Sequence, residues 1–270
     1  MLEIFSYDFM VRALIVGTLV SLCAALLGVI LVLKRYSMIG DGLSHVGFGA
    51  LAVAAAANIA PLQVAVPVVL IAAFCLLRLS KKSKLNGDAA IAVISSSALA
   101  VGVIVASVSG LNTDLNSYLF GSILATTDTD AVFCVVLAVV VIAVFLVFYN
   151  KIFSVTFDEN FAAATGTRPA LYNMIIAALT ALTIVIGMRI MGTLLISALI
   201  IFPALSAMRL CKSFKSVIIV SGILSVFCFI FGLILSYYFD IPTGPTVVLF
   251  NCAVLLIFFV ISKIRMKLMM

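Results

Sequence analysis

Asp41 and His45 are the residues of this chain whose types and spacing are best suited to chemistry. They lie between Ile39 and Gly47, and His45 is the one histidine among 270 residues. Residues four apart share one face of an α-helix, so a carboxylate oxygen and an imidazole nitrogen would lie side by side. These atoms are ligands of divalent metal ions. The spacing therefore predicts half of a metal site.

Other interpretations of the pair stay open at this point. Asp41 could be the N-cap of a helix that begins late. His45 could hydrogen-bond a carbonyl of a neighbouring helix. Small residues surround the pair, and they either let another backbone approach closely or leave space for a permeating ion. They are Gly42, Ser44, Gly47, Gly49 and Ala50.

Two ligands make an incomplete site, because tetrahedral zinc takes four. A second copy of the chain would supply another aspartate and histidine across a two-fold axis. Water or other helices could also complete the shell. Weak binding suits conduction, since a permeating ion must bind well enough to enter and loosely enough to leave.

The composition places the pair in a membrane protein. Hydrophobic residues make up 66% of the chain and charged residues 10%, and the mean hydropathy is +1.39. Soluble domains contain about 45–50% and about 25% of these classes. An ionisable residue inside a membrane segment is costly and marks a candidate functional site. The net charge of +6 comes from short basic clusters at segment ends, so no nucleic-acid partner is expected.

Apolar runs of about 20 residues predict an all-α polytopic membrane protein, and β-barrel patterns are absent. We expect about nine transmembrane helices, with eight to ten possible, and one transmembrane domain over residues 1–270. His45 would lie roughly 14 Å and Asp41 roughly 8 Å along the second helix. The expected spans are 12–33, 37–57, 61–79, 89–108, 130–149, 172–188, 191–208, 217–237 and 245–262.

The basic clusters predict the orientation of the chain. They fall at alternate ends of the spans, so all of them can be cytoplasmic at once, with the N-terminus outside. Arg189 and the segment 240–245 would mark outer turns. The clusters are Lys34-Arg35, Lys81 to Lys84, Lys151, Arg209 to Lys215 and Lys263 to Lys267.

Two stretches are neither spans nor tight turns. Residues 112–130 have an apolar core too short to cross the membrane, so they predict an outer loop with a short surface helix or a re-entrant helix. Residues 151–169 predict a cytoplasmic loop with a short helix near 156–166. Acidic residues suit the first turn of that helix and Gly166 suits its end.

The short helix would carry an apolar stripe of Phe157, Phe161 and Ala164. Such a stripe could dock into a groove of a partner protein or lie on the membrane surface. Basic residues are sparse within the helix, which favours docking. No phosphate-binding loop of the form G-x-x-x-x-G-K-[ST], no G-x-S-x-G and no H-E-x-x-H occurs. These absences argue against an intramembrane enzyme and indicate that the chain carries no ATP-binding motif of its own.

Five motifs in order resemble the permease subunits of the bacterial ABC-type zinc, manganese and iron importers, the ABC-3 family. The resemblance spans nearly the whole chain and is nearest to the zinc-type members. The motifs lie at residues 34–45, 117–124, 157–166, 191–204 and 242–246.

The resemblance implies a homodimeric pore in the bacterial inner membrane, bound to two cytoplasmic ABC ATPase subunits. An extracytoplasmic metal-binding protein would deliver the ion. No cofactor would be bound permanently, and zinc or manganese would be the transported substrate. Asp41 and His45 match the metal-passage residues of the family. The coupling helix that contacts the ATPase matches Asp158, Glu159, Phe161, Ala162, Ala163 and Gly166.

Two rival functions remain. The first is a secondary metal transporter that couples to protons through Asp41 and His45. The second is an ABC permease for a metal chelate such as a siderophore. The lone Asp–His pair argues against the second, because a bulky organic ligand needs no metal-binding side chains in the wall.

Overall fold

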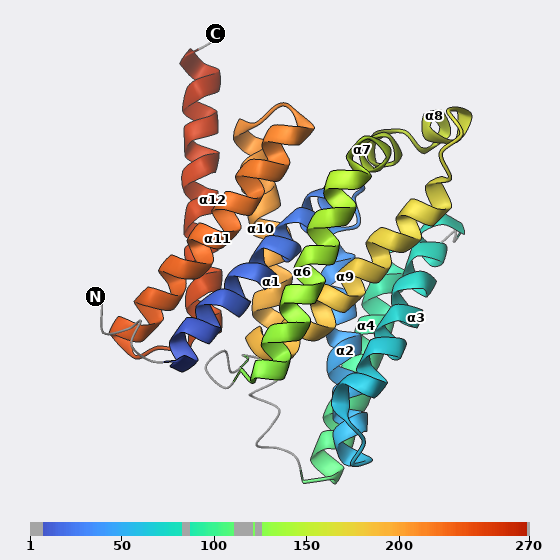
Figure 1. Cartoon of the computed structure of the whole chain (residues 1–270), viewed down its shortest axis with the longest axis vertical. Helices are drawn as coiled ribbons and strands as arrows, with labels where there is room; N and C mark the ends of the chain where they lie inside the picture. The colour runs from blue at the N-terminus through green and yellow to red at the C-terminus, as the bar shows by residue number, and fades with distance from the viewer. Residues whose placement is uncertain (1–7, 83–86, 111–120, 122–125, 269–270) are drawn as a thin grey trace.

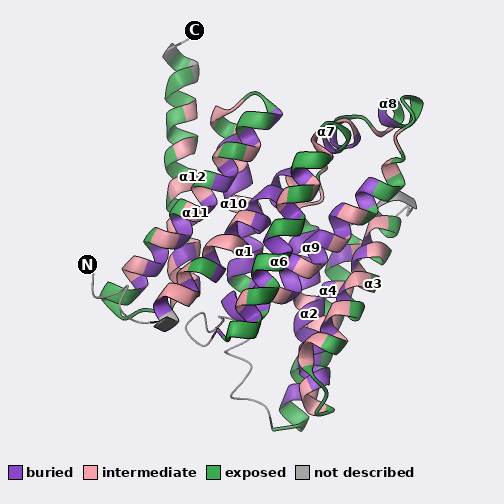
Figure 2. Cartoon of the chain, viewed as in Figure 1, coloured by how far each residue is buried: buried purple, intermediate pink, exposed green. Residues whose placement is uncertain are grey.

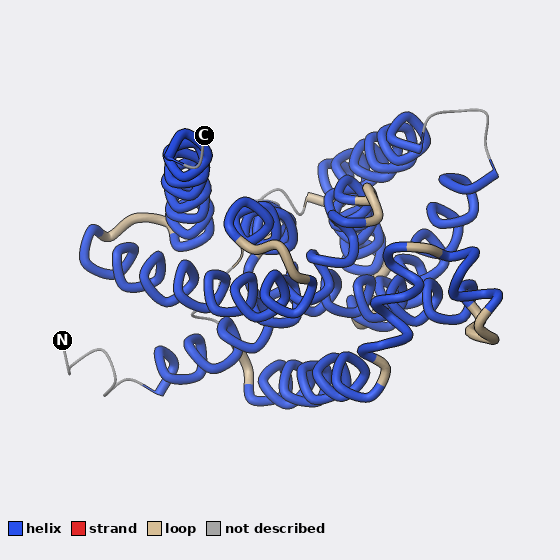
Figure 3. The backbone as a smooth tube through the Cα atoms, turned by 90° about the horizontal axis from the view of Figure 1, so that it is seen from above, coloured by secondary structure: helices blue, strands red, loops and turns tan. Residues whose placement is uncertain are grey.

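The chain folds into a bundle of helices. The computed structural model describes residues 8–82, 87–110, 121 and 126–268. Over these ranges the chain is helix and loop, as Figure 3 shows from above, and the prediction of an all-α fold is confirmed. The helices of Figure 1 are α1 (Asp8–Leu33), α2 (Ser37–Ala56), α3 (Pro61–Lys82), α4 (Gly87–Val108), α6 (Asp128–Val147), α7 (Tyr149–Phe157), α8 (Glu159–Ala164), α9 (Pro169–Met191), α10 (Thr193–Leu210), α11 (Phe214–Phe239) and α12 (Thr243–Leu268).

The expected number of spans is confirmed. Nine helices of the described chain are long and apolar enough to cross a membrane, namely all except α7 and α8. Predicted and observed ends differ by a few residues. The span expected at 217–237, for example, begins at Phe214 because the hydroxyl of Ser213 caps that helix, accepting from the backbone N–H of Ser216.

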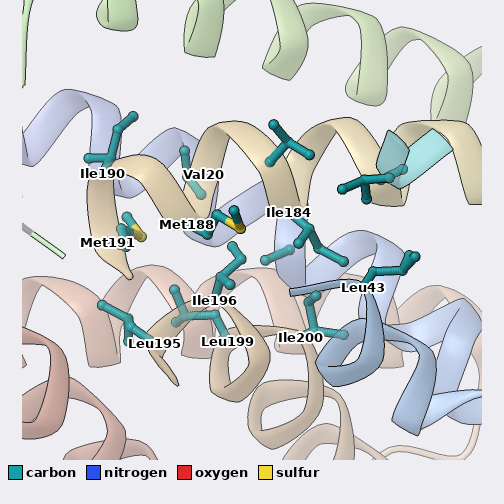
Figure 4. Packing of buried hydrophobic residues seen from close by; sticks show 14 of the residues in the cluster. Val20, Leu43, Ile184, Met188, Ile190, Met191, Leu195, Ile196, Leu199 and Ile200 are labelled. Atoms are coloured by element: carbon teal, nitrogen blue, oxygen red, sulfur yellow. The ribbon is translucent and has the colours of Figure 1, made fainter. Parts of the chain in front are cut away.

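Four helices form the centre of the molecule. Side chains of α1, α2, α9 and α10 meet in one buried cluster, of which Val20, Leu43, Met188 and Leu199 are members (Figure 4). Figure 2 shows buried residues along the same helices, whereas little of α12 is buried. Exposed apolar surface on a membrane bundle faces lipid or another subunit. The pair expected on α2 therefore lies on a central helix.

Glycines decide how closely the central helices approach. A Cβ on Gly28 of α1 would lie 1.9 Å from the carbonyl oxygen of Ile200 on α10, so these backbones touch only because no side chain intervenes. Gly192, with φ of 83°, ends α9 and begins α10. The turn expected at Arg189 is therefore at Gly192, and Arg189 lies in the last turn of α9.

The stretch expected to be a cytoplasmic loop is more regular than predicted. Residues 149–157 form α7 and residues 159–164 form α8, with Asp158 between the two helices. Most of the outer stretch 112–130 lies outside the described residues, and its last residues begin α6. In Figure 1, α8 and the end of α12 lie at one end of the bundle and the start of α1 lies toward the other. That arrangement agrees with the predicted orientation.

Candidate metal path and coupling segment

Asp41 and His45 lie one turn apart inside a regular helix. α2 begins at Ser37, so Asp41 is not the N-cap of a helix that starts late. Oδ2 of Asp41 is 3.6 Å from Nε2 of His45. That separation exceeds a normal hydrogen bond. The two atoms are therefore adjacent without a hydrogen bond of normal length between them.

Both side chains of the pair are partly open. The side chain of Asp41 is 42% exposed and that of His45 is 27% exposed. The opposite faces of α2 are covered, because Gly42 and Gly49 pack on α4 and Gly40 packs on Ile200 of α10. At 100° per residue, Asp41 and His45 fall between the α4 face and the α10 face. They therefore lie at a short opening on the first turns of α2, which closes further along the same face, where Phe48 and Ala52 are buried. We call this opening the open strip of α2.

His45 is not held by a neighbouring carbonyl. Its Nδ1 atom is buried and has no hydrogen-bond partner among the described residues. A buried polar atom without a partner is uncommon and costly. The structure thus gives no support to a purely structural histidine that bonds a carbonyl of the next helix.

The pair is incomplete within one chain. No group of three or more His, Cys, Asp or Glu side chains that could hold a metal occurs in the part of the chain that the structure describes. A carboxylate and an imidazole alone fill two of the positions that a divalent ion needs. Within the described residues, no further His, Cys, Asp or Glu side chain joins the pair to make a group of three.

The small residues around the pair serve packing. A Cβ on Gly49 would lie 2.5 Å from the carbonyl oxygen of Ala98 on α4, and one on Gly47 would lie 2.7 Å from the sulfur of Met188 on α9. Ser44 donates to the carbonyl of Asp41 at 2.7 Å, and its hydroxyl lies 3.3 Å from that of Ser197 on α10. These contacts fix the position of α2 and so the direction in which the pair projects.

Defined residues begin and end the helix of the predicted coupling segment, which spans residues 157–166. The carboxylate of Asp158 accepts hydrogen bonds from the backbone N–H groups of Asn160 and Phe161, at 2.9 and 3.0 Å. This is an N-cap. Gly166 has φ of 80° and ends the segment, as expected from the sequence.

The two faces of the coupling segment differ in exposure. Phe157 and Phe161 are 58% and 61% exposed, and Ala163 is also exposed. Ala162, on the other face of α8, is fully buried. Exposed aromatic side chains at the end of α7 and on α8 are candidates for an apolar contact surface. The exposure of Phe157, Phe161 and Ala164 agrees with the prediction, but the single helix expected near 156–166 is wrong, because the extended backbone of Asp158 divides it and leaves Phe157 on α7 and Phe161 on α8.

Glu159 points back into the molecule. Its Oε1 lies 2.9 Å from Nζ of Lys34 and accepts a hydrogen bond from Nδ2 of Asn173 at 2.9 Å. The side chains of Lys34 and Asn173 did not emerge as site candidates from the sequence. Their only local signals are polarity at the ends of apolar spans. We call Lys34, Glu159 and Asn173 the inner-end triad.

Charged groups also join the helices at the opposite end. Nη1 of Arg189 lies 3.0 Å from Oδ1 of Asp130, and Nη2 of Arg12 lies 2.7 Å from Oδ1 of Asp128. Asp130 also accepts from the backbone N–H and hydroxyl of Thr127. Arg189, expected as a residue near an outer turn, therefore pairs with a specific carboxylate.

The chain is similar to known proteins along nearly its whole length. The sequence pattern of the ABC 3 transport family matches residues 6–262. The manganese import system permease protein ScaB of Streptococcus gordonii is 31% identical over 260 residues, which are 96% of this chain and 94% of ScaB. The high-affinity zinc uptake system membrane protein ZnuB of Haemophilus influenzae is 32% identical over 244 residues, covering 90% and 94% of the two chains.

A solved structure shares the fold. It is PsaBC from Streptococcus pneumoniae in complex with Fab, of which one chain superimposes with a TM-score of 0.85 and is 31% identical. The match covers 96% of this chain and 92% of that chain. The arrangement of helices in Figure 1 is therefore that of a known permease architecture.

Proposed function

Because this chain belongs to the ABC 3 transport family, we propose that it is the multi-pass permease subunit of an ATP-driven importer of divalent metal ions in the bacterial inner membrane. The observation that supports a divalent metal ion as the substrate is the pair of Asp41 and His45, which lie side by side on the open strip of α2. The relatives named for manganese and zinc support the same class of substrate.

The path for the ion is proposed to run past the open strip of α2. A second copy of the chain, placed against this strip, would bring another Asp41 and His45 to the same path. Four ligands from two chains would complete a divalent site that neither chain holds alone. The oxygen and imidazole ligands suit zinc and manganese, and the absence of thiolate ligands from the pair suits release.

The energy is proposed to come from separate ATPase subunits on the cytoplasmic side. This chain has no phosphate-binding loop of its own, and the exposed surface of Phe157, Phe161 and Ala163 offers a docking site at that side. An extracytoplasmic metal-binding protein would deliver the ion to the other end. The permease itself would perform no covalent chemistry.

Reconstitution in liposomes tests the proposal. We expect uptake of radioactive zinc or manganese only when the chain is reconstituted with its ATPase subunit and ATP is supplied. Uptake by the chain alone, driven by a proton gradient, would instead establish a secondary transporter. Uptake of an intact metal chelate but not of the free ion would establish a chelate permease. The metal is identified by which ion restores growth to a deletion strain under chelation.

A further inference from the structure

The inner-end triad connects three parts of the chain that are far apart in sequence. Nζ of Lys34 donates to Oε1 of Glu159 at 2.9 Å and to Oδ1 of Asn173 at 2.6 Å, and Asn173 donates back to the same carboxylate at 2.9 Å. Lys34 lies in the turn between α1 and α2, Glu159 begins α8, and Asn173 lies in the first turns of α9. The three side chains form a closed triangle.

The triad is partly enclosed: two of its three side chains are buried. The side chain of Lys34 is 7% exposed and that of Glu159 is 36% exposed, while Asn173 is buried. A buried ion pair adds little net stability compared with apolar residues, but removal of one partner strands the other charge. The triad therefore adds little net stability, and its main effect is to hold the α1–α2 turn, the start of α8 and the first turns of α9 at fixed distances from one another.

The triad spans a gap between the coupling segment and the start of α2. Residues 33–36 and residues 155–157 with Glu159 face each other across a hollow of about 260 Å³. In the described chain, α8 packs mainly on α7 and α9. The Lys34–Glu159 pair crosses from this unit to the turn that leads into α2.

A movement of the turn between α1 and α2 would displace Asp41 and His45. Lys34 is three residues before Ser37, the first residue of α2. Ser37 and His45 are roughly 12 Å apart along a rigid helix. A displacement of α8 that drags Lys34 would therefore tilt or shift α2 together with Asp41 and His45.

We propose that Lys34 and Asn173 are positioning residues, which together with Glu159 transmit a displacement of α8 to α2 and so set the access of the Asp41–His45 pair. This inference rests on the proposed function of the chain. In this proposal Glu159 acts through its contacts with Lys34 and Asn173 of the same chain, although the sequence suggested that it contacts the ATPase directly. Docking then falls to the exposed aromatic side chains Phe157 and Phe161.

The test separates transmission from docking and from folding. Lys34→Met and Glu159→Gln are each reconstituted with the ATPase subunit, and metal uptake is measured per ATP hydrolysed. We expect both variants to retain the ATPase on co-purification and to keep hydrolysing ATP, while uptake per ATP falls about tenfold, within the usual range of coupling between sites. Lys212→Met, which removes an exposed lysine at the same membrane side, should leave all three quantities unchanged.

A charge exchange provides the rescue. Lys34→Glu combined with Glu159→Lys restores opposite charges, and the amide of Asn173 can turn over to donate and accept in the reversed sense. We expect the double variant to recover a large part of the uptake per ATP that the single variants lose. If the triad were only structural, the double variant would regain stability but not uptake per ATP.

Three results would overturn the inference. Uptake per ATP at the wild-type level in both single variants would show that the triad transmits nothing. Loss of the ATPase on purification would make Lys34 or Glu159 a docking residue. Failure of Glu159→Gln, which keeps the shape and an acceptor oxygen, to accumulate in the membrane would make the triad a folding element. Absence of uptake by the wild-type complex would instead overturn the proposed function.

Discussion

At the level of single residues, Asp41 and His45 combine adjacency with exposure. Their atoms lie 3.6 Å apart without a hydrogen bond of normal length. Ser44 and the glycines on either side tie α2 to its neighbours and leave the pair on the open strip. An ion that approached along this strip would meet a carboxylate and an imidazole together.

We therefore expect Asp41→Ala and His45→Ala each to abolish metal uptake in reconstituted liposomes. Each change removes one of two adjacent ligands and leaves the backbone of α2 unaltered. The amount of protein in the membrane and the recovery of ATPase on purification should not change. Val53→Ala, an exposed change on the same helix, should transport normally. Wild-type uptake by either ligand variant would make the pair structural.

The two aspartates at the start of α6 should differ in their effect on stability. Asp130 has a side chain 9% exposed, pairs with Arg189 and closes a capping box with Thr127. Asp128 is 86% exposed and its pair with Arg12 is at the surface. Asp130→Ala leaves a 39% exposed arginine without this partner and removes one half of the capping box, so we expect a loss of about 1–2 kcal/mol. Asp128→Ala should cost about 0–1 kcal/mol.

Thermal unfolding of the purified protein in detergent measures both changes. Equal midpoints for Asp130→Ala and the wild type would show that the charged contacts at this end add nothing. Arg189→Met, which strands the carboxylate instead of the cation, should resemble Asp130→Ala in its midpoint.

Residue spacing predicted the local contacts and missed the distant ones. Asp41 and His45 are four residues apart, and helical periodicity alone places them together. Glu159 and Asn173 are 125 and 139 residues from Lys34 in the chain. Nothing in the surrounding residues indicates which distant segment a lysine at the end of a span will meet. The inner-end triad therefore became visible only once the helices were placed.

At the level of elements, apolar length predicted the spans well because each helix must cross the same thickness of hydrocarbon. It failed at residues 151–157, which are helical although they include Lys151 and Ser154. α7 is stabilised by its aromatic contacts rather than by membrane burial. Phe153 and Phe157 lie 5.4 and 5.8 Å from the ring of Phe214 on α11.

The packing of α2 on α4 offers a test at this scale. A Cβ on Gly49 would meet the backbone oxygen of Ala98 at 2.5 Å, and a backbone atom cannot swing aside. Gly49→Ala should therefore force the helices apart and cost about 1–3 kcal/mol. At Gly222 the nearest atom is the side-chain tip of Leu22 at 3.0 Å, so Gly222→Ala should be tolerated. Detergent unfolding midpoints compare the two variants, and equal midpoints would contradict the close approach of α2 and α4.

The exposed face of α8 offers a second test at the level of elements. We expect Phe161→Ala to weaken binding of the ATPase subunit by about tenfold or more, since aromatic anchors dominate such interfaces. The fold should be unaffected, because the side chain is 61% exposed. Phe239→Ala is the matched control, since Phe239 is 69% exposed and is the last residue of α11, whose C-terminal end lies away from α8 in Figure 1. Affinity is measured by titration of the detergent-solubilised permease. Unchanged affinity would place the docking surface elsewhere.

At the level of the whole molecule, we propose a working unit larger than one chain because the Asp41–His45 pair is incomplete, whereas exposed apolar surface is also what contact with lipid requires. Exposed apolar surface covers much of α3, α4 and α12 (Figure 2). The metal pair is half a site in the described chain and lies on the open strip of α2. We propose that a two-fold assembly with its axis near this strip doubles the ligands.

A mixed dimer tests whether the two half-sites act together. Wild-type and His45→Ala chains carrying different tags are co-expressed, and sequential affinity steps isolate dimers with one chain of each kind. If two chains share one ion path, removal of one imidazole leaves three ligands, and uptake should fall to well below half of the wild-type value. Independent paths would retain about half. Recovery of no mixed species, with single chains that transport normally, would refute the two-fold pore and require the missing ligands to come from water or from residues of the same chain.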